Sequence, residues 1–355
     1  MKNLKKMTFA AIAAGSMLLA ACGGGDGGNG DNGAENGGGD DVVSAGDEHS
    51  FIYLTNDPIG VNKFLESGKI GIEKAAEEFN GTSKTFEGGN EESLRANLEA
   101  AVAEAPDVIV MITFDFTDLS KEFAEANPDQ EFLLIDDCPE GAPENLTCAV
   151  FREHEAAYLI GIQAGMLTET NQVGSIIAQD IPFLHRYSDA FYEGALAMNP
   201  DATDTQLAIG GDNPFGDPAK GKEQALAMAA TGADHVFAVG AGSNGGIFEA
   251  AAEEGFTSYG VDVNQCPDAP GFIGDGTLKA VDVLVVSEIG KILDGTNDPV
   301  SSYGLAEGGM DVVSQTDEAA DSQCTVMEHP EVVEKIAEVK QQIIDGEIDI
   351  TDPLA

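Results

Sequence analysis

Short apolar runs alternate with amphipathic segments along the chain from about residue 50 to residue 293. The apolar runs are rich in Val, Ile and Phe, which is typical of strands in parallel sheets that are covered on both faces. We expect strands at residues 50–55, 107–113, 131–135, 173–178, 206–209, 235–239 and 258–261. We expect helices at residues 64–79, 91–105, 119–126, 155–168, 183–198, 218–231, 246–254 and 277–293, and a final one at 329–346. This alternation predicts an α/β fold built from βα units.

Polar segments follow several of the expected strands directly. Asp136 and Asp137 come after one strand, residues 210–217 and 240–246 after two others, and Asp262 after a fourth. In open parallel sheets, ligands bind outside the carboxyl ends of the strands, where short loops and helix N-termini meet. Because these four loops come from both halves of the chain, we expect one ligand cleft between two lobes.

The first 21 residues are expected to be a lipoprotein signal peptide. Lysines precede an apolar stretch that is too short to span a bilayer but suits a signal-peptide core. The segment ends in Leu19-Ala20-Ala21-Cys22, which matches the bacterial lipobox. We therefore expect Cys22 to be lipidated, with palmitate among its lipids, and to anchor the protein on the extracytoplasmic face of the cell membrane. A plain secretory signal with an incidental cysteine is the alternative.

Residues 22–49 are expected to form a flexible tether, since they are nearly all Gly, Asp, Asn and Glu and have no apolar surface to bury. The remainder, residues 50–355, is long enough for two lobes. We expect lobe 1 to comprise about residues 50–153 and 265–298, and lobe 2 about residues 154–264 and 299–355.

The chain is strongly acidic, with 17 Lys and Arg against 63 Asp and Glu and a formal net charge of −46. Every charge in the signal segment is a lysine, so its removal makes the chain still more negative. Nucleic acid is therefore not expected as a partner. A solvated acidic surface that serves solubility or a saline habitat explains the charge; attraction of cationic ligands is the alternative reading.

Four cysteines follow Cys22, an even number in a chain expected in an oxidising compartment, so two disulfides are predicted. Three pairings are possible. Cys138 and Cys148 flank a loop rich in Pro and Gly, which favours their pairing and leaves Cys266 with Cys324. A zinc site is the alternative, although no CxxC pair or neighbouring histidine supports it.

The glycine-rich segment 240–246 lies between an expected strand and an expected helix. Gly240, Gly242 and Gly245 have the GxGxxG spacing, but no acidic residue follows at the interval that a dinucleotide site needs. We expect these glycines instead to let backbone N–H groups approach a ligand closely.

Other candidate ligand contacts are carboxylates and aromatic rings. Asp136, Asp137 and Asp262 suit the vicinal hydroxyls of a sugar, with an acid pair for hydrolysis as the alternative. Phe64 and Phe215 each follow a polar loop at the entrance to a helix, where their rings could hold a flat ligand between them. Lys279, expected near a helix N-terminus where a cation is unfavourable, suggests a specific polar partner. No nucleophile, tuned acid or metal-ligand cluster is evident, so we expect no catalytic residue, cofactor or metal.

Taken together, these segments resemble the basic membrane protein family of substrate-binding lipoproteins, which includes the purine nucleoside receptor A type. The likeness extends from about Phe51 to Leu293. The segments that carry it are Asp57-Pro-Ile-Gly-Val-Asn-Lys-Phe64, Phe132-Leu-Leu-Ile-Asp-Asp137, Glu155-Ala-Ala-Tyr-Leu-Ile-Gly161, Asn213-Pro-Phe-Gly-Asp-Pro-Ala-Lys-Gly221, Gly240-Ala-Gly242, Gly260-Val-Asp-Val-Asn-Gln265 and Leu278-Lys-Ala-Val-Asp282.

The resemblance implies a type I periplasmic-binding-protein fold, two Rossmann-like lobes joined by hinge crossovers, that closes on a nucleoside. It implies that Phe64 and Phe215 clamp a purine, that Asp136 contacts the base, and that Asp262 and Lys279 hold the ribose. It also implies a backbone contact from Gly242 and polar contacts from the first lobe. Residues that could supply these first-lobe contacts are Asn62, which precedes Phe64 by two positions, and Thr55, Asn56 or Asp57 in place of an early aspartate.

The resemblance further implies a non-enzymatic, monomeric receptor that presents its ligand to the permease of an ABC importer. Riboflavin and sugar are alternative ligands of the same fold, although this chain has no Trp of the kind on which sugar rings often stack. A ligand-binding co-receptor for a membrane sensor is a further alternative. A nucleoside hydrolase is disfavoured because an aspartate-dense N-terminal motif is absent from the sequence.

Overall fold

The computed structural model describes residues 49–354. The expected signal peptide, the lipidation site Cys22 and almost all of the expected tether lie outside these residues. Within the described part of the chain, no helix combines the length and the apolar character that a membrane crossing requires.

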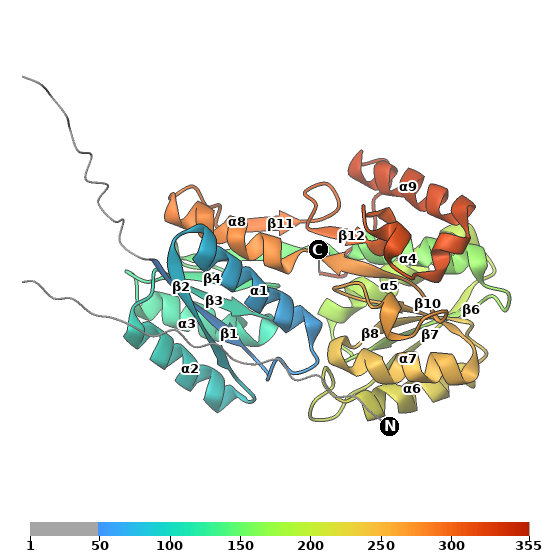
Figure 1. The fold of residues 1–355 in the computed structure, drawn as a ribbon, viewed down its shortest axis with the longest axis horizontal. Helices are drawn as coiled ribbons and strands as arrows, with labels where there is room; N and C mark the ends of the chain where they lie inside the picture. Colours follow the sequence, from blue (N-terminus) through green and yellow to red (C-terminus); the bar gives the residue numbers. More distant parts are fainter. Residues whose placement is uncertain (1–48, 355) are drawn as a thin grey trace, which may run out of the picture. The chain divides into compact units, whose positions relative to one another are not determined.

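Two six-stranded sheets organise the described residues (Figure 1). The first has the order β11-β5-β4-β3-β1-β2 and the second the order β12-β10-β9-β8-β6-β7. All strand pairs are parallel except β10 with β12. The strands of the first sheet are β1 (His49–Thr55), β2 (Gly81–Glu87), β3 (Val108–Ile112), β4 (Glu131–Ile135), β5 (Leu146–Phe151) and β11 (Val300–Tyr303). Those of the second are β6 (Gln172–Ile177), β7 (Thr203–Ala208), β8 (His235–Val239), β9 (Thr257–Gly260), β10 (Ile273–Lys279) and β12 (Met310–Val312).

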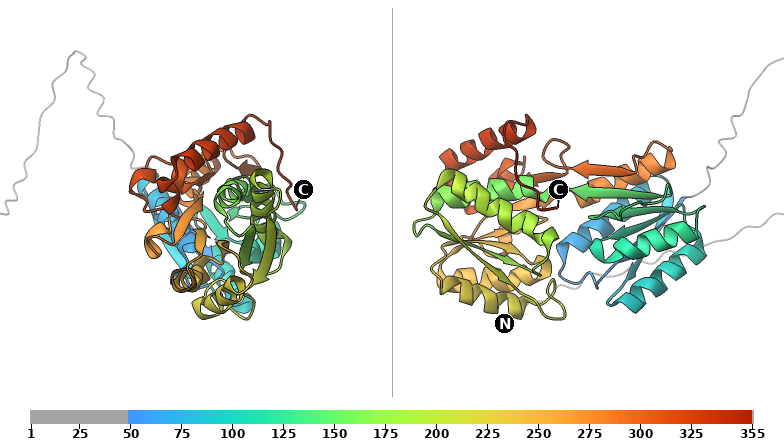
Figure 2. Two further views of the ribbon diagram at one scale, coloured as in Figure 1. Left: turned by 90° about the vertical axis from the view of Figure 1, so that its right-hand side faces the viewer. Right: turned by 180° about the vertical axis from the view of Figure 1, so that it is seen from behind.

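Helices cover both faces of each sheet, which explains why a central strand such as β3 is apolar throughout. In β1, Phe51 and Tyr53 belong to one core cluster, while Ile52 and Leu54 belong to another on the opposite face. The helices of the first lobe are α1 (Lys63–Glu78), α2 (Glu91–Glu104), α3 (Thr117–Ala126) and α8 (Val281–Leu293). Those of the second are α4 (Glu153–Leu167), α5 (Pro182–Met198), α6 (Pro218–Ala229), α7 (Asn244–Glu254) and α9 (Pro330–Ile344). The right-hand view in Figure 2 shows these layers.

The chain passes between the two sheets three times. It crosses after β5 into α4, after β10 into α8, and between β11 and β12. The expected lobe ranges therefore differ from the structure in two segments. Residues 273–279 lie in the second sheet rather than in lobe 1, and residues 300–303 lie in the first sheet rather than in lobe 2. The sequence pattern does not record which sheet a late segment joins: β10 pairs with β9 and β12 in the second sheet, and β11 pairs with β5 in the first.

The expected strands and helices all occur, with shifts of a few residues at their ends, but one boundary is wrong. Residues 277–279 belong to β10, and the helix expected from residue 277 begins at Val281. The strands β2, β5, β10, β11 and β12 were not expected from the pattern. Glycine and aspartate interrupt β10, yet its glycines are required by packing, because a Cβ on Gly276 would lie 3.1 Å from the carbonyl oxygen of Gly260.

The structure contains the two disulfides Cys138–Cys148 and Cys266–Cys324. This confirms the pairing that the Pro/Gly-rich loop favours and excludes the zinc alternative for these four thiols. The two cysteines of the first bond are 10 positions apart in the sequence, and those of the second are 58 positions apart.

Candidate ligand-binding site

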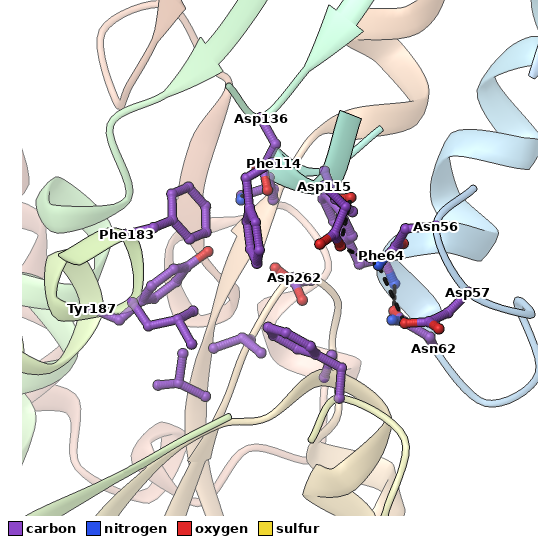
Figure 3. A pocket seen from close by; sticks show the side chains of 17 residues that line it. Asn56, Asp57, Asn62, Phe64, Phe114, Asp115, Asp136, Phe183, Tyr187 and Asp262 are labelled. Atoms are coloured by element: carbon purple, nitrogen blue, oxygen red, sulfur yellow. Dashed lines mark hydrogen bonds and ion pairs between the residues drawn. The ribbon is translucent and has the colours of Figure 1, made fainter. Parts of the chain in front are cut away.

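A pocket lies at the carboxyl ends of strands from both sheets (Figure 3). Its volume is about 60 Å³, room for a few water molecules. Of the eight expected contacts, seven line it: Asp57, Asn62, Phe64, Asp136, Phe215, Asp262 and Lys279. The remaining lining residues are Asn56, Thr113, Phe114, Asp115, Phe183, Leu184, Tyr187, Val239, Ala241 and Val261.

Gly242 is the expected contact that does not line the pocket; its neighbour Ala241 does. A Cβ at Gly242 would lie 2.9 Å from the carbonyl oxygen of Phe215 and 3.0 Å from Cγ2 of Val61. Gly242 therefore permits a close approach between the loop before α7, the loop of Phe215 and the entrance to α1.

Three phenylalanine rings meet across the pocket. Phe114 follows β3 in the first lobe, and its ring centroid lies 5.5 Å from that of Phe183 and 6.3 Å from that of Phe215, both in the second lobe. Figure 3 shows the rings of Phe114 and Phe183 side by side. A flat ring held between two others needs about 7 Å, twice a normal carbon contact. The Phe114 and Phe215 planes, tilted by 54°, must therefore move apart before they can enclose a ring.

Phe64 lines the pocket next to the buried ammonium of Lys279. Its ring is 7% exposed, and the Nζ atom of Lys279 lies 5.0 Å from the ring centroid. The same ammonium lies 4.9 Å from the ring of Phe151, 5.6 Å from that of Phe183 and 5.8 Å from that of Tyr187. The faces of these aromatic rings attract the Lys279 ammonium electrostatically. The ring of Phe215 contacts that of Phe114, and Phe64 lines the same pocket.

Lys279 lies at the end of β10, not in a helix, and its side chain is 2% exposed. Its Nζ donates to Asp136 Oδ1 at 2.7 Å and to Glu153 Oε1 at 3.0 Å. The specific polar partner that the sequence suggested is therefore this pair of carboxylates. Asp136 follows β4, and Glu153 begins α4 immediately after the first crossover.

The charges around Lys279 shift one another's pKa values. Burial raises the pKa of Asp136 to about 6, with Lys279 opposing this and Glu153 reinforcing it. Burial likewise raises the pKa of Asp262 to about 6. Burial lowers the pKa of Lys279, but Asp136 and Glu153 outweigh it, so that the net shift is well upward. Lys279 therefore stays charged, and Asp136 and Asp262 are the groups that take up a proton as the pH falls.

Four residues that line the pocket just after a strand have positive φ although none is glycine. The φ angles are 85° for Thr113, 89° for Asp136, 48° for Ala241 and 70° for Asp262. Such conformations cost free energy and persist where the surrounding structure imposes them, often at functional sites. Here they occur where the backbone turns out of the sheet at the pocket wall.

A polar group from the first lobe lines another side of the pocket. Asn56 Nδ2 donates to Asp115 Oδ2 at 2.7 Å and to Asp57 Oδ2 at 3.2 Å (Figure 3). Burial raises the pKa of Asp115, and burial together with Asp115 raises that of Asp57. Asn56 Oδ1 is buried without a hydrogen-bond partner among the described residues, which leaves an acceptor for a ligand. Asn62 Oδ1, in contrast, caps α1 by accepting from the N–H groups of Phe64 and Leu65.

Sequence reasoning missed several of the lining residues. Phe114 and Asp115 follow an expected strand just as Asp136 does, so the same strand-end rule could have found them. Phe183 and Tyr187 lie one turn apart in α5, where a helical apolar stripe is typical of ordinary core packing. Glu153 carried no signal, because nothing local marks a carboxylate that pairs with a lysine distant in sequence.

Two sheets joined by three crossovers, with a pocket at the carboxyl ends of their strands, are the architecture of a two-lobed solute-binding protein. The family described as "ABC transporter substrate-binding protein PnrA-like" (Bmp) matches residues 51–353, and the chain belongs to this family. The family consists of binding proteins of ABC transporters and not of enzymes, so the protein takes a small-molecule ligand and has a membrane permease as its partner.

Curated relatives agree with this assignment. The chain is 27% identical over 307 residues to the "CD4+ T-cell-stimulating antigen" of Listeria innocua, covering 82% of each chain. It is 27% identical over 323 residues to the "ABC transporter nucleoside-binding protein BmpA" of Lactococcus lactis, covering 84% of this chain and 88% of that one. It also resembles the "Basic membrane protein A" of Borreliella burgdorferi, at 29% identity over 69% of this chain and 73% of that one.

Solved structures confirm the expected fold. An ABC transporter solute-binding protein from Aeropyrum pernix K1 superposes with a TM-score of 0.76 at 26% identity, covering 86% of this chain and 94% of that one. A solute-binding protein from Conexibacter woesei shares the fold with a TM-score of 0.67 at 17% identity, covering 86% of this chain and 99% of that one. The α/β type I periplasmic-binding-protein fold is therefore correct.

Proposed function

We propose that this protein binds a nucleoside, and specifically a purine nucleoside, in the pocket between its lobes. The observation that carries the proposal is the composition of the pocket wall. It combines aromatic rings from both lobes, suited to a flat base, with a carboxylate and an ammonium, Asp262 and Lys279, suited to sugar hydroxyls. The nucleoside-binding relative from Lactococcus lactis adds support.

The charge of the pocket supports a neutral ligand. Four lining carboxylates, Asp57, Asp115, Asp136 and Asp262, face one lining cation, Lys279, which is already bonded to Asp136. A phosphate would meet like charge there, while the N–H and O–H donors of a nucleoside would meet acceptors. Discrimination against nucleotides is the expected consequence.

Ligand entry requires motion. The tilted Phe114 and Phe215 rings leave too little room for a base, so we propose that the lobes open about the three crossovers and close on the nucleoside. The closed form would then dock on the permease. Cys22 would hold the monomeric protein at the extracytoplasmic face of the membrane through its lipid.

The test is to identify what the purified protein, carrying Cys22→Ser to remove the lipid, releases on denaturation, using mass spectrometry. Calorimetric titrations with adenosine, guanosine, inosine, cytidine, riboflavin, ribose and a nucleotide follow. Tight binding of purine nucleosides without turnover is expected. Binding of riboflavin or ribose alone would refute the nucleoside as the ligand. Release of free base from a nucleoside would show that the protein is an enzyme and not a receptor.

The variant Phe215→Ala tests the stacking of the base most directly. Loss of one stacking ring should weaken purine nucleoside binding by about 1–3 kcal/mol, or roughly 5- to 150-fold. Phe272→Ala, a partly buried ring of the same lobe outside the pocket, is the matched control. Equal affinity in the native protein and Phe215→Ala would contradict a stacking role.

A further inference from the structure

A line of alternating charges runs from the pocket wall to the C-terminal segment. Asp136 bonds to Lys279 at 2.7 Å, and Lys279 to Glu153 at 3.0 Å. The other carboxylate oxygen of Glu153 accepts from Arg186 Nη1 at 3.1 Å. Arg186 then donates to both carboxylate oxygens of Asp352, at 2.9 Å and 2.7 Å.

These groups come from five separate parts of the fold. Asp136 follows β4 in the first sheet, and Lys279 ends β10 in the second. Glu153 begins α4 after a crossover, Arg186 lies in α5, and Asp352 lies in the segment after α9. The charge network therefore links both lobes, two crossovers and the C-terminal segment.

Arg186 is fixed in this network by more than one contact. Its Nη1 also donates to the carbonyl oxygen of Phe151 at 2.9 Å, just before the crossover into α4. The fork of the guanidinium matches the Asp352 carboxylate with two parallel bonds, a geometry that lysine cannot reproduce. Side-chain exposure is 12% for Arg186 and 18% for Asp352, so water competes little for these bonds.

Glu153 has no exposed surface and needs its two cations. Arg186 engages Oε2 and Lys279 engages Oε1, which holds the carboxylate in one orientation. Without Arg186, Lys279 would be the remaining cation for both Glu153 and Asp136. A buried carboxylate with one oxygen unpaired would turn toward other donors, and the Lys279 ammonium would move with it.

We propose that Arg186 is a positioning residue for ligand binding: it fixes Glu153, Glu153 fixes the Lys279 ammonium at the pocket wall, and Asp352 of the C-terminal segment holds Arg186. The proposal rests on the proposed function in so far as Lys279 contacts the ligand. It assigns residues that do not line the pocket to the binding machinery, and it gives the C-terminal segment a part in ligand affinity.

The dependence of affinity on pH separates positioning from a purely structural role. The charged and titratable groups around the network are Asp136, Asp137, Arg152, Glu153, His154, Glu155, Arg186, Tyr187, Asp262, Lys279 and Asp352. Loss of the guanidinium removes a cation near the carboxyl group of Asp136, so Asp136 protonates at a higher pH. Affinity should then begin to fall at a higher pH in the variant than in the native protein as the solution is acidified.

The first experiment measures guanosine affinity by calorimetry between about pH 5 and pH 9. Arg186→Gln should weaken binding by roughly 10- to 100-fold, the range for residues that orient a direct contact, and Asp352→Asn by a smaller factor. Arg186→Lys should recover part of the loss and the native pH profile. Lys222→Gln is the matched control, since Lys222 bonds only to Glu249 and Glu253 on the surface of the same lobe among the described residues.

The second experiment needs no ligand. It measures the ¹⁵Nζ ammonium resonance of Lys279 by NMR, and the resonance is assigned by its absence from the Lys279→Met spectrum. We expect it to shift in Arg186→Gln and Asp352→Asn but not in Lys222→Gln. This result, together with no nucleoside binding by the native protein, would leave the positioning role intact and reject the proposed ligand. An unchanged resonance and unchanged affinity in folded Asp352→Asn and Arg186→Gln would overturn the proposal; if Arg186→Gln fails to fold, Asp352→Asn decides.

Discussion

Replacement of Lys279 by methionine tests the buried charge cluster in the pocket wall most directly. Methionine has a similar shape but leaves Asp136 without its cation, and no other side chain among the described residues donates to Asp136. Glu153 keeps Arg186 as a partner. Removal of one member of a buried ion pair costs about 3–5 kcal/mol, because the remaining charge stays buried. At roughly 2–4 °C per kcal/mol for a protein of this size, the melting temperature should fall by about 10 °C.

The loss of stability in Lys279→Met should depend on pH. The pKa of Asp136 is already raised to about 6 by burial, and without Lys279 it rises further. A carboxyl group with a folded-state pKa above the unfolded one favours folding at low pH, and this advantage is lost as the pH rises through the folded-state pKa. The deficit of Lys279→Met should therefore be small near pH 5 and reach its full size above about pH 8.

The assay is urea unfolding, followed by circular dichroism across this pH range. The double variant Lys279→Met/Asp136→Asn should recover most of the stability at high pH, because no unpaired charge remains at Asp136. Lys74→Met is the control: Lys74 bonds to Asp282 at 2.6 Å, but its side chain is 53% exposed, so a loss of at most about 1 kcal/mol is expected. A deficit of equal size at every pH would refute the reasoning.

Three further predictions concern stability. Burial, reinforced by Asp189, raises the pKa of Asp204 to about 7, so Asp204→Asn should stabilise the fold by up to roughly 4 kcal/mol above pH 8 and hardly at all near pH 4; exposed Asp201→Asn is the control, and a gain independent of pH would argue against this cause. Replacing both Cys266 and Cys324 by serine should lower the free energy of unfolding by about 4 kcal/mol, since the disulfide closes the longer loop; a loss below that of the shorter-loop disulfide would contradict the loop argument. Calorimetric melting temperatures should rise as KCl increases from about 0.1 M to 1 M, because the Debye length falls from about 10 Å to 3 Å and screens the net charge of −46; a constant melting temperature would show that charge repulsion contributes little.

Features that depend on neighbouring residues could be predicted from the sequence alone. The alternation of apolar and amphipathic segments is local, so the α/β fold and the main strands and helices followed from it. The strand-end rule needs only the order of elements, and it correctly brought Asp136 and Asp262 to one pocket. The disulfide between Cys138 and Cys148 spans a short loop, so its pairing could be predicted from the sequence.

Other features depend on contacts between distant parts of the chain, which only the tertiary structure decided. Lys279 bonds to Asp136 across 143 residues, and Arg186 to Asp352 across 166 residues. Whether these groups meet is set by the three crossovers, which no local periodicity records. The strand β10 shows the same limit: its glycines disfavour a strand locally, yet close packing against β9 requires them. The sequence by itself therefore determined the elements and the edge where the pocket lies, and the crossovers decided which charges and rings meet in it.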